Sequence, residues 1–572
     1  MATTTVSIGS RTNTVDTQTP ASNVGGTGPS YTVTFGTTPT GIAVGHIGTV
    51  DAYSWDEESS SVFVYVVTAI SGDNITVKYL KDTESRGHAS PYGLYSDGGS
   101  SGSPVQQVMV FKRSGITTAQ ASASAPSYTV TFGDAGPPAD LHVGDLGSGS
   151  DQSSGSDYTY VVTGIDLSNK TVTMQYVHDD GDNGTTSPHG LVGEDGNQLI
   201  IDFNRAFSTI TLFEEMIDDS SPNYWGSSDD VVGELHADST FTDNDINFNS
   251  KQSLSSVTLS VYSDDRHDGT AESGALIKPT SKGTHSHGLI QVQIDDMTIE
   301  WLDISLASVP DTSGGTNSQN QGIRIVGNNI DNLIIRNNLI HDCSGNKGSA
   351  GPSGIAASTD GGLGNTWSFL NNIIYGMTET ADDSATGIVC RKYRGTFYIY
   401  NNTIYKITGH GGSKDAIGIR VGYYTNMTYL YIKNNIVAGL SASDDEYAYD
   451  IQSNVSNKSV GYNLSDDTSE SSRNAQNMGR SYNTTVNPGA LVGKTLSEID
   501  FNENDITGSV DLHIGTSSAC LEAGVDLGTT NGVNIDIDGL DRDATGVTWD
   551  IGADQKSEAA STGSPAFLMF VD

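Results

Sequence analysis

The sequence predicts an all-β chain in which two tandem small antiparallel modules, of sandwich or barrel form, precede a long solenoid of parallel strands. Three observations predict this fold class. A stretch of about 97 residues occurs twice in the first part of the chain. Two short motifs recur in phase beyond residue 320. Runs rich in Val, Ile, Thr and Tyr alternate with clusters of Gly, Asp and Ser, which is typical of short strands joined by tight turns.

The composition excludes several classes of protein. The 572 residues include 69 acidic residues and only 28 Lys and Arg, which leaves a formal net charge of −41. Binding to nucleic acid or to an anionic membrane surface requires clustered cations, so we expect neither partner. The three cysteines, Cys343, Cys390 and Cys520, are too few for a disulfide framework. The start shows no basic or apolar leader and no apolar run exceeds six residues, so we expect no signal peptide and no membrane-spanning helix.

The first part of the chain contains a duplicated module. The segment SYTVTFG occurs at residues 30–36 and again at residues 127–133, an offset of 97. Further matches keep offsets between 95 and 99, so we expect one module over 29–120 and its duplicate over 126–205. Short β-rich runs within each copy favour a small antiparallel sandwich or barrel. Residues 1–28, rich in Thr, Ser, Gly and Asn, are expected to form a flexible arm that orders only against a partner.

A second repeat governs the rest of the chain. The dipeptide Asn-Asn, followed by two mostly apolar residues, recurs with steps of 34, 30 and 33 residues. The dipeptide Gly-Ile begins at residues 322, 354, 387 and 418, with steps of 32, 33 and 31. Because two landmarks keep one period, we expect each repeat to be one turn of a coil whose successive turns stack about 4.8 Å apart.

Alternation of side chains along each strand predicts which residues face inward. One inward file would contain Ile323, Ile355, Ile388 and Ile419, with Ile325, Ala357, Cys390 and Val421 beside them. A second file would contain Leu333, Trp367, Phe397 and Leu430, with Ile335, Phe369, Ile399 and Ile432 beside them. The same parity predicts an inward ladder of corner amides, formed by Asn337, Asn371, Asn401 and Asn434. The second Asn of each pair would then supply the left-handed backbone of the corner.

The ends of such a coil need covering, because they expose unpaired strand edges. Residues 206–229 would form a linker and a cap, with a short amphipathic helix over 209–218. At the far end, segments within 534–554 would close the coil, which we place at 230–555. Residues 556–572 are a polar linker and an apolar tail that would dock on this chain, a sister subunit or a larger assembly.

The two landmarks in phase resemble those of right-handed parallel β-helix proteins, the group that includes pectate lyases, polygalacturonases and phage tailspikes. The resemblance covers residues 230–555. Combined with the acidic composition, the arm and the modules, it implies a virion structural protein of the fibre, spike or capsid-decorating type, on the outer face of the particle. The arm and modules would attach to other virion proteins, and the β-helix would meet a host-surface glycan or receptor. The same analogy implies a homotrimer.

Aromatic side chains near the turn corners are the candidates for glycan binding. These candidates are Tyr398, Tyr400, Tyr423, Tyr424 and Tyr431. Trp367 lies near them in sequence, but its inward parity argues against a role in binding.

A polysaccharide lyase or hydrolase is the second hypothesis. Enzymes of the resembled fold use carboxylates on adjacent turns, and the nearest set here is Asp382, Asp383 and Asp415, with His410 in the loop of Asp415. Adjacent turns would bring these carboxylates to the separation of roughly 5 to 9.5 Å that glycosidases use. However, neighbouring aspartates are expected in the exposed loops of so acidic a chain. The Asn-Thr-Asp and Arg-Ile-Lys segments of polygalacturonases are also absent, so the sequence favours a protein without catalysis.

Four aspartates near the end of the chain surround a glycine, as in an oxygen-ligand calcium loop. They are Asp536, Asp538, Asp541 and Asp543. Arg542 lies among them, and the later Glu of an EF-hand is missing. The sequence therefore favours a salt-bridged turn without a metal, and we expect no cofactor apart from this calcium alternative.

A bacterial surface or filament-forming protein, exported through its C-terminus, is the third hypothesis. The acidic chain with an apolar end gives it slight support. The glycine-rich calcium nonapeptides common in that export route are missing from the sequence.

Overall fold

The computed structural model describes residues 3–556 except 12–13, 19, 26–29, 36–40, 54–59, 83–108, 113, 118–126, 134, 151–156, 180–190, 192–198, 219–227, 282–287, 308–320, 327–329, 346–350, 358–364, 381–383, 392–394, 411–414, 423–428, 452–456, 467–489, 505–509 and 545–546. The described residues are nearly all β, which confirms the predicted fold class. Two compact units are present, Thr4–Ser208 and Thr209–Asp572, the latter joined by Met1–Thr3. No helix in the described part of the chain is long and apolar enough to span a membrane.

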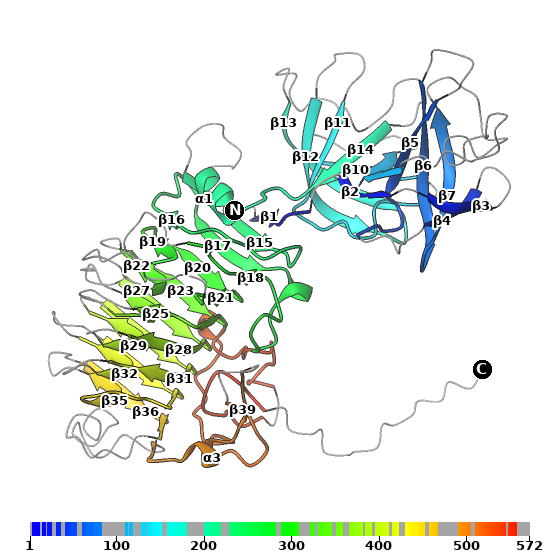
Figure 1. Ribbon diagram of the computed structural model, residues 1–572. Helices are drawn as coiled ribbons and strands as arrows, with labels where there is room; N and C mark the ends of the chain where they lie inside the picture. Colours follow the sequence, from blue (N-terminus) through cyan, green and yellow to red (C-terminus); the bar gives the residue numbers. More distant parts are fainter. Residues whose placement is uncertain are drawn as a thin grey trace, which may run out of the picture. The chain divides into compact units, whose positions relative to one another are not determined.

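The first unit contains two antiparallel sheets (Figure 1). The first sheet has the order β2 (Thr14–Gln18), β8 (Met109–Lys112), β5 (Ile47–Tyr53), β6 (Ser60–Ser71), β7 (Asn74–Asp82), β4 (Ser30–Phe35) and β3 (Pro20–Gly25). The second has the order β10 (Ser127–Thr131), β13 (Thr171–Asp179), β12 (Asp157–Asp166), β11 (Leu146–Ser150), β14 (Leu199–Asn204) and β9 (Ser114–Thr117).

The two sheets repeat the same packing, as the duplicated sequence implies. Tyr31 meets Tyr65 edge to face with ring centroids 6.4 Å apart, and the equivalent Tyr128 and Tyr160 meet in the same way at 6.1 Å. The division between the sheets differs from the predicted one, because β9 pairs with β14 of the second sheet. The second sheet therefore includes Ser114–Thr117, whereas the repeated sequence placed the start of the second module at residue 126.

The flexible arm predicted over residues 1–28 is wrong for much of its length. This stretch includes β1 (Thr3–Ile8) and the strands β2 and β3. Ser7 in β1 donates its hydroxyl to the buried carboxylate of Asp145 at 2.8 Å. The Thr-rich composition suggested a solvated arm, but threonine is also a strong strand former, and sheet pairing decides between these states.

The second unit is a parallel β-helix built from three sheets (Figure 1). Sheet 1 contains, in order, β15 (Asp230–Leu235), β17 (Ser256–Val261), β20 (Met297–Glu300), β23 (Leu333–Arg336), β27 (Asn365–Leu370), β30 (Gly395–Tyr400), β33 (Tyr429–Lys433) and β36 (Asn457–Gly461). Sheet 2 contains β18 (Leu276–Ile277), β21 (Asp303–Ser305), β24 (Leu339–His341), β28 (Ile373–Glu379), β31 (Thr403–Thr408), β34 (Ile436–Ala438), β37 (Leu464–Ser465) and β38 (Leu491–Val492), with β25 (Ser344–Gly345) beside β28. Sheet 3 contains β16 (Ile246–Phe248), β19 (Ile290–Val292), β22 (Gln321–Ile325), β26 (Ser353–Ala357), β29 (Ala385–Cys390), β32 (Ala416–Val421) and β35 (Glu446–Ile451).

The inward files occupy the places that the period predicts. In sheet 3, Ile323, Ile355, Ile388 and Ile419 are in register on successive strands. In sheet 1, Leu333, Trp367, Phe397 and Leu430 are in register. All eight side chains are fully buried. The core of the coil is therefore a set of vertical apolar columns.

The glycine that precedes each isoleucine in sheet 3 is required by packing. A Cβ on Gly387 would lie 2.6 Å from Ile404 Cγ2 and 2.8 Å from the carbonyl oxygen of Gly418. Equivalent contacts, with a branched side chain of sheet 2 and a carbonyl oxygen of the next strand of sheet 3, recur at Gly322, Gly354 and Gly418. Branched side chains of sheet 2 thus fill the space above these glycines, which explains why the Gly-Ile landmark keeps the period.

The asparagine ladder exists, but one residue later than predicted. The first Asn of each pair adopts the left-handed conformation, with φ between 53° and 56° at Asn337, Asn371, Asn401 and Asn434. A left-handed residue breaks the alternation of side chains, so the second Asn points inward. The ladder contains Asn338, Asn372, Asn402, Asn435 and Asn463, each amide donating to the next at 2.9 or 3.0 Å. Of the predicted ladder, only the bond from Asn401 to Asn371 is present, at 2.9 Å.

The first Asn of each pair instead binds the C-terminal segment. Asn371 donates to the carbonyl oxygen of Ile535 at 2.6 Å, and Asn401 donates to that of Val533 at 3.1 Å. Asn434 both donates to Val525 and accepts from its backbone N–H. The corner asparagines therefore form a docking line for a segment that follows them by about 100 residues or more.

The C-terminal segment covers the side of the coil, whereas the sequence placed it at the end (Figure 1). It includes α3 (Leu496–Ile499), β39 (Phe501–Glu503), β40 (Asp511–Ile514) and η4 (Thr530–Gly532). Its apolar residues, including Leu512, Ile537 and Ile551, pack with Ile373 and Tyr405 of sheet 2 in one buried cluster. This second core seals the outer face of sheet 2. Residues 557–572, which contain the predicted apolar tail, lie outside the described residues.

A helix stands before the first turn, where the sequence predicts a cap. Helix α1 (Ile210–Asp218) buries Ile210, Phe213 and Ile217. Phe213 contacts Phe248 of β16 with ring centroids 6.2 Å apart. A short 3-10 turn, η2 (Ser263–Asp265), follows β17.

Candidate functional site

The outer face of sheet 1 carries tyrosines on two successive turns. In β30 and β33 buried residues alternate with partly or fully exposed ones. The register pairs Tyr398 with Tyr431, and their rings stack with centroids 5.0 Å apart and an interplanar angle of 15°. Tyr429, on the same face, is 44% exposed. These three residues, Tyr398, Tyr429 and Tyr431, form the tyrosine platform.

Tyr400 anchors one end of the platform. Its ring centroid lies 5.6 Å from that of Tyr398. Both rings pack against a buried cluster of Leu370, Val533 and Trp549, two of which belong to the C-terminal segment. Burial raises the pKa of the Tyr400 hydroxyl above its ordinary value. The C-terminal segment therefore fixes the edge of the platform, while the stacked pair keeps partial exposure.

The remaining aromatic residues considered for glycan binding do not belong to the platform as the structure describes it. Tyr423 and Tyr424 lie outside the described residues. Trp367 is fully buried and donates its indole N–H to the carbonyl oxygen of Ile330 at 2.9 Å, as its inward parity predicts. Tyr429 was missed by sequence reasoning, although its spacing of two from Tyr431 places both on one face of a strand.

The candidate catalytic residues are only partly covered by the structure. Asp382 and Asp383 lie outside the described residues. Asp415 accepts a hydrogen bond from Arg420 Nη2 at 2.9 Å, and the same guanidinium binds Asp450 at 2.9 Å. Burial raises the pKa of the Asp415 carboxyl, and Arg420 opposes this shift. Asp415 is thus held in an ion pair that links adjacent turns.

His410 is exposed at the end of the turn that contains β31. It lies in a Gly-His-Gly triplet, residues 409–411. Sequence reasoning overlooked this triplet, although it could be read directly from the chain.

A cleft of about 610 Å³ lies where the C-terminal segment meets the early turns of the coil. Its walls include Arg266, Trp301, His513, Asp538 and Asp554. The Arg266 guanidinium stacks over the Trp301 ring, 4.5 Å from its centroid. Trp301 occupies the corner position that Asn holds in later turns and is left-handed as well, with φ of 63°. The cleft thus combines an aromatic wall, a cation and several carboxylates.

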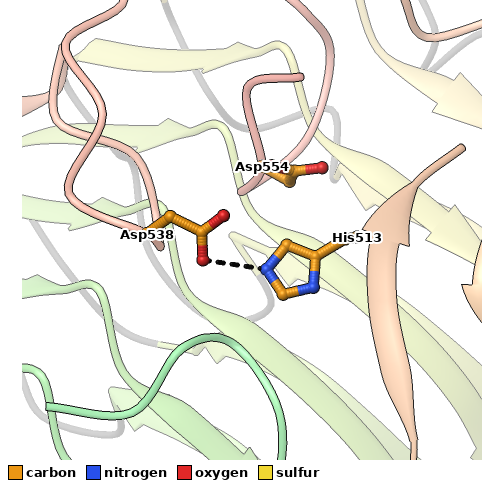
Figure 2. A group of neighbouring side chains, drawn as sticks. All are labelled: His513, Asp538 and Asp554. Carbon is orange, nitrogen blue, oxygen red and sulfur yellow. Dashed lines mark hydrogen bonds and ion pairs between the residues drawn. The ribbon is translucent and has the colours of Figure 1, made fainter. Parts of the chain in front are cut away.

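His513 is the central ionisable group of the cleft (Figure 2). Its Nδ1 contacts Asp511 Oδ1, and its Nε2 lies 3.0 Å from Asp538 Oδ1. Burial disfavours the imidazolium, but the hydrogen bonds to Asp511 and Asp538 and the nearby Asp554 outweigh it and raise the pKa of His513 to about 11. Sequence reasoning missed His513, because Asp538 and Asp554 follow it by 25 and 41 residues and no motif joins them.

The four aspartates of the predicted calcium loop each bind different partners. Asp536 is fully buried and accepts from the backbone N–H groups of Asp538, Leu540 and Gln555. Burial raises the pKa of its carboxyl to about 6. Asp538 instead turns to His513. The predicted set therefore does not converge on one point.

The rest of the set does not form the expected salt-bridged turn. Asp541 accepts from Asn534 at 2.8 Å, and Asp543 accepts from the indole of Trp549 at 3.2 Å. The buried Arg542 donates to the carbonyl oxygens of Gly552 and Ala553 at 2.8 Å each. A guanidinium enclosed by carbonyl groups, rather than a salt bridge, organises this turn.

Comparison with known proteins gives no family assignment. No protein-family model and no curated protein matches the chain. Among solved structures, a chain titled glycoside hydrolase is similar over 78% of this chain and 75% of its own, at 9% sequence identity and a TM-score of 0.12. A TM-score this low supports no conclusion about fold or activity.

Proposed function

We propose that this protein is a virion structural protein of the fibre, spike or capsid-decorating type, which attaches the particle to a glycan on the host surface. The observation that carries the binding role is the tyrosine platform. The stacked pair Tyr398 and Tyr431 is partly exposed, and its ring edges and outer ring faces are where the C–H face of a sugar ring can pack. The duplicated modules and the acidic parallel β-helix support the placement on a particle by their resemblance to spike proteins.

The negative charge of the chain disfavours the binding of acidic glycans. A net charge of −41 repels polyanionic sugars such as uronates over a range set by ionic strength. Stacking on tyrosine needs no charge on the ligand. We therefore expect the platform to prefer uncharged hexose-containing glycans to acidic ones.

A glycan array with the full chain tests this proposal. The wild type should bind neutral glycans, and Tyr398→Ala and Tyr431→Ala should each lower the affinity about tenfold or more, since each removes half of the stacked surface. The matched control is Tyr462→Asn, which removes a corner tyrosine at φ of 54° and installs the residue found at the other corners. Binding that is unchanged in both platform variants would contradict the proposal.

The trimeric state is proposed from the same resemblance. Mass measurement by light scattering at micromolar concentration should give three times the mass of the chain. A stable monomer would contradict the proposed trimer. It would not bear on glycan binding, which the array tests separately.

A polysaccharide hydrolase is the second candidate, favoured by the Gly-His-Gly triplet around His410. It would use His410 with Asp382 and Asp383, which precede it by 28 and 27 residues in the sequence. Incubation with polysaccharides should then release new reducing ends, and Asp383→Asn should abolish the release. No product from a range of neutral and acidic polysaccharides would end this candidate.

A further inference from the structure

Three side chains from separate parts of the C-terminal segment converge in the wall of the cleft (Figure 2). They are His513 in β40, Asp538 in the turn that follows the buried Asp536, and Asp554 near the end of the described chain. One nitrogen of the imidazole and one oxygen of each carboxylate all lie within 4.8 Å of one another. Two ligands of a single ion are separated by at most twice the metal–ligand distance, about 4 to 5 Å. The three atoms therefore lie close enough to share one ion.

Asp511 fixes the orientation of the His513 imidazole. Asp511 binds Nδ1 and also accepts the backbone N–H of His513 at 3.1 Å, so Nε2 faces Asp538 and Asp554. A carboxylate on the far nitrogen of a ligating histidine is the usual way in which proteins fix the ring and increase its basicity. Asp554 is also positioned, because its Oδ2 accepts the backbone N–H of Ile514 at 2.8 Å.

The charge around His513 is not balanced by basic side chains. Asp511, Asp538 and Asp554 supply three carboxylates against one imidazolium, and a metal ion that binds Nε2 replaces the proton on that nitrogen. Among the described residues, no Lys or Arg forms an ion pair with any of the three. Arg542 acts on Asp554 only through space, and it also acts on Asp536 and Asp550, since its guanidinium donates to the backbone carbonyl oxygens of Gly552 and Ala553. A partly buried cluster of this kind is stabilised by a cation.

The cluster is accessible from the cleft. The Asp538 side chain is 33% exposed and that of His513 is 13% exposed. The cleft of about 610 Å³ leaves room for water or a ligand in the open coordination positions. Three protein ligands with an open side differ from a closed structural site, which has four.

We propose that His513, Asp538 and Asp554 bind one divalent first-row transition-metal ion, with Asp511 as the residue that positions the imidazole. A nitrogen ligand beside two carboxylates suits Zn²⁺ or Mn²⁺ better than Ca²⁺, which prefers six to eight oxygens. The site differs from the predicted loop of four aspartates, of which it uses only Asp538. It does not depend on the proposed glycan binding.

Titration calorimetry of the full chain, after removal of metals with a chelator, tests the site with Zn²⁺. We expect one Zn²⁺ per chain in the wild type and at least tenfold weaker binding in His513→Gln and Asp538→Asn. Asp511→Asn should weaken binding about tenfold, the lower end of the range for such positioning groups. Addition of Co²⁺ should give visible absorption bands that are lost in His513→Gln, which reports the imidazole as a ligand.

The matched control is Asp444→Asn in the other carboxylate cluster, Asp415 with Asp444 and Asp445. That cluster is purely acidic, so its variant should bind Zn²⁺ as the wild type does. Asp538→Asn changes a partly exposed side chain, so it remains informative if His513→Gln does not fold. No binding by the wild type, unchanged binding in Asp538→Asn, or tighter binding of Ca²⁺ than of Zn²⁺ would each overturn the assignment.

Discussion

Asn372 donates its side-chain amide to Asn402 Oδ1 at 3.0 Å, and the same oxygen accepts the backbone N–H of Asn372 at 3.1 Å. One side chain thus satisfies two buried donors of the neighbouring turn. Asn402 Nδ2 in turn donates to the carbonyl oxygen of Phe369 and to Asn435 Oδ1, each at 2.9 Å. Each asparagine of the ladder therefore links three successive turns, and its buried polar atoms have hydrogen-bond partners only because the neighbouring asparagines are present.

Removing one rung should be costly. In Asn402→Ala the buried donors of Asn372 lose their acceptor, and an unsatisfied buried group costs about 1 to 3 kcal/mol. We expect the free energy of unfolding to fall by about 3 kcal/mol or more, measured by denaturant titration. The matched change is Asn401→Gly, which keeps the left-handed corner and loses only bonds to the C-terminal segment and Asn371. A larger loss in Asn401→Gly than in Asn402→Ala would contradict the ladder.

The ladder also shows how far the sequence alone leads. The period, the inward files and the presence of a corner ladder follow from spacing and alternation. The assignment of the rungs to the first Asn failed because parity was carried through a residue at φ of about 55°. Trp301 and Tyr462 occupy the same left-handed corner without being Asn, so a search for the Asn pair alone misses those turns.

The glycine column predicts a second set of variants. Gly387→Ala should destabilise the coil by about 1 to 3 kcal/mol, because its Cβ would overlap Ile404 Cγ2 and the carbonyl oxygen of Gly418. Gly164→Ala is the control, since its Cβ would meet only Thr173 at 3.6 Å. Thermal unfolding of both variants checks the difference. Equal and small effects would show that the column is not packed as described.

A buried histidine predicts a dependence of stability on pH. His341 lies between Asp303 and Asp342, at 2.9 and 2.8 Å. Burial lowers its pKa, but the two carboxylates outweigh this and raise the pKa to about 9. A histidine whose folded pKa exceeds its unfolded value of about 6.5 stabilises the fold fully below pH 6.5.

This contribution, roughly 3 kcal/mol, should be lost as the pH rises from 6.5 through 9. The measurement is the free energy of unfolding of the wild type minus that of His341→Gln across this range. The difference should decline with rising pH. A difference that is flat or grows would contradict the charged state of His341.

The cap helix predicts the opposite kind of variant, one that stabilises. Burial, the hydrogen bond with Asp218 and the neighbouring carboxylates raise the pKa of Glu214 to about 8. A carboxyl whose folded pKa exceeds its unfolded value favours folding only while protonated, so stability is lost as the pH rises from about 4.5 to 8. Glu214→Gln stays neutral and should be more stable than the wild type at pH 8, by roughly 2 kcal/mol once the full effect of about 4 to 5 kcal/mol is reduced for the partial exposure of the carboxyl to solvent. The two proteins should converge near pH 4.5, and a variant less stable at pH 8 would refute the assignment.

The site was less predictable than the fold for a physical reason. The tyrosine face follows from alternation within strands, so Tyr398, Tyr400 and Tyr431 could be found from sequence. The cleft depends on the return of the C-terminal segment along sheet 2, which brings His513 and Trp301 together from positions more than 200 residues apart. No periodic signal encodes that return, and the carbonyl-bound Arg542 gave the misleading pattern of a salt bridge.

Peptide mass spectrometry of purified virus particles tests most directly whether this chain is the outer particle component that we propose. Particles released from cells that carry the gene should contain peptides of this chain in a fixed ratio to the capsid protein. Mild protease treatment of intact particles should remove β-helix peptides, since the coil would face outward. Particles that lack the chain, with its peptides confined to the cell fraction, would contradict a place on the virus particle.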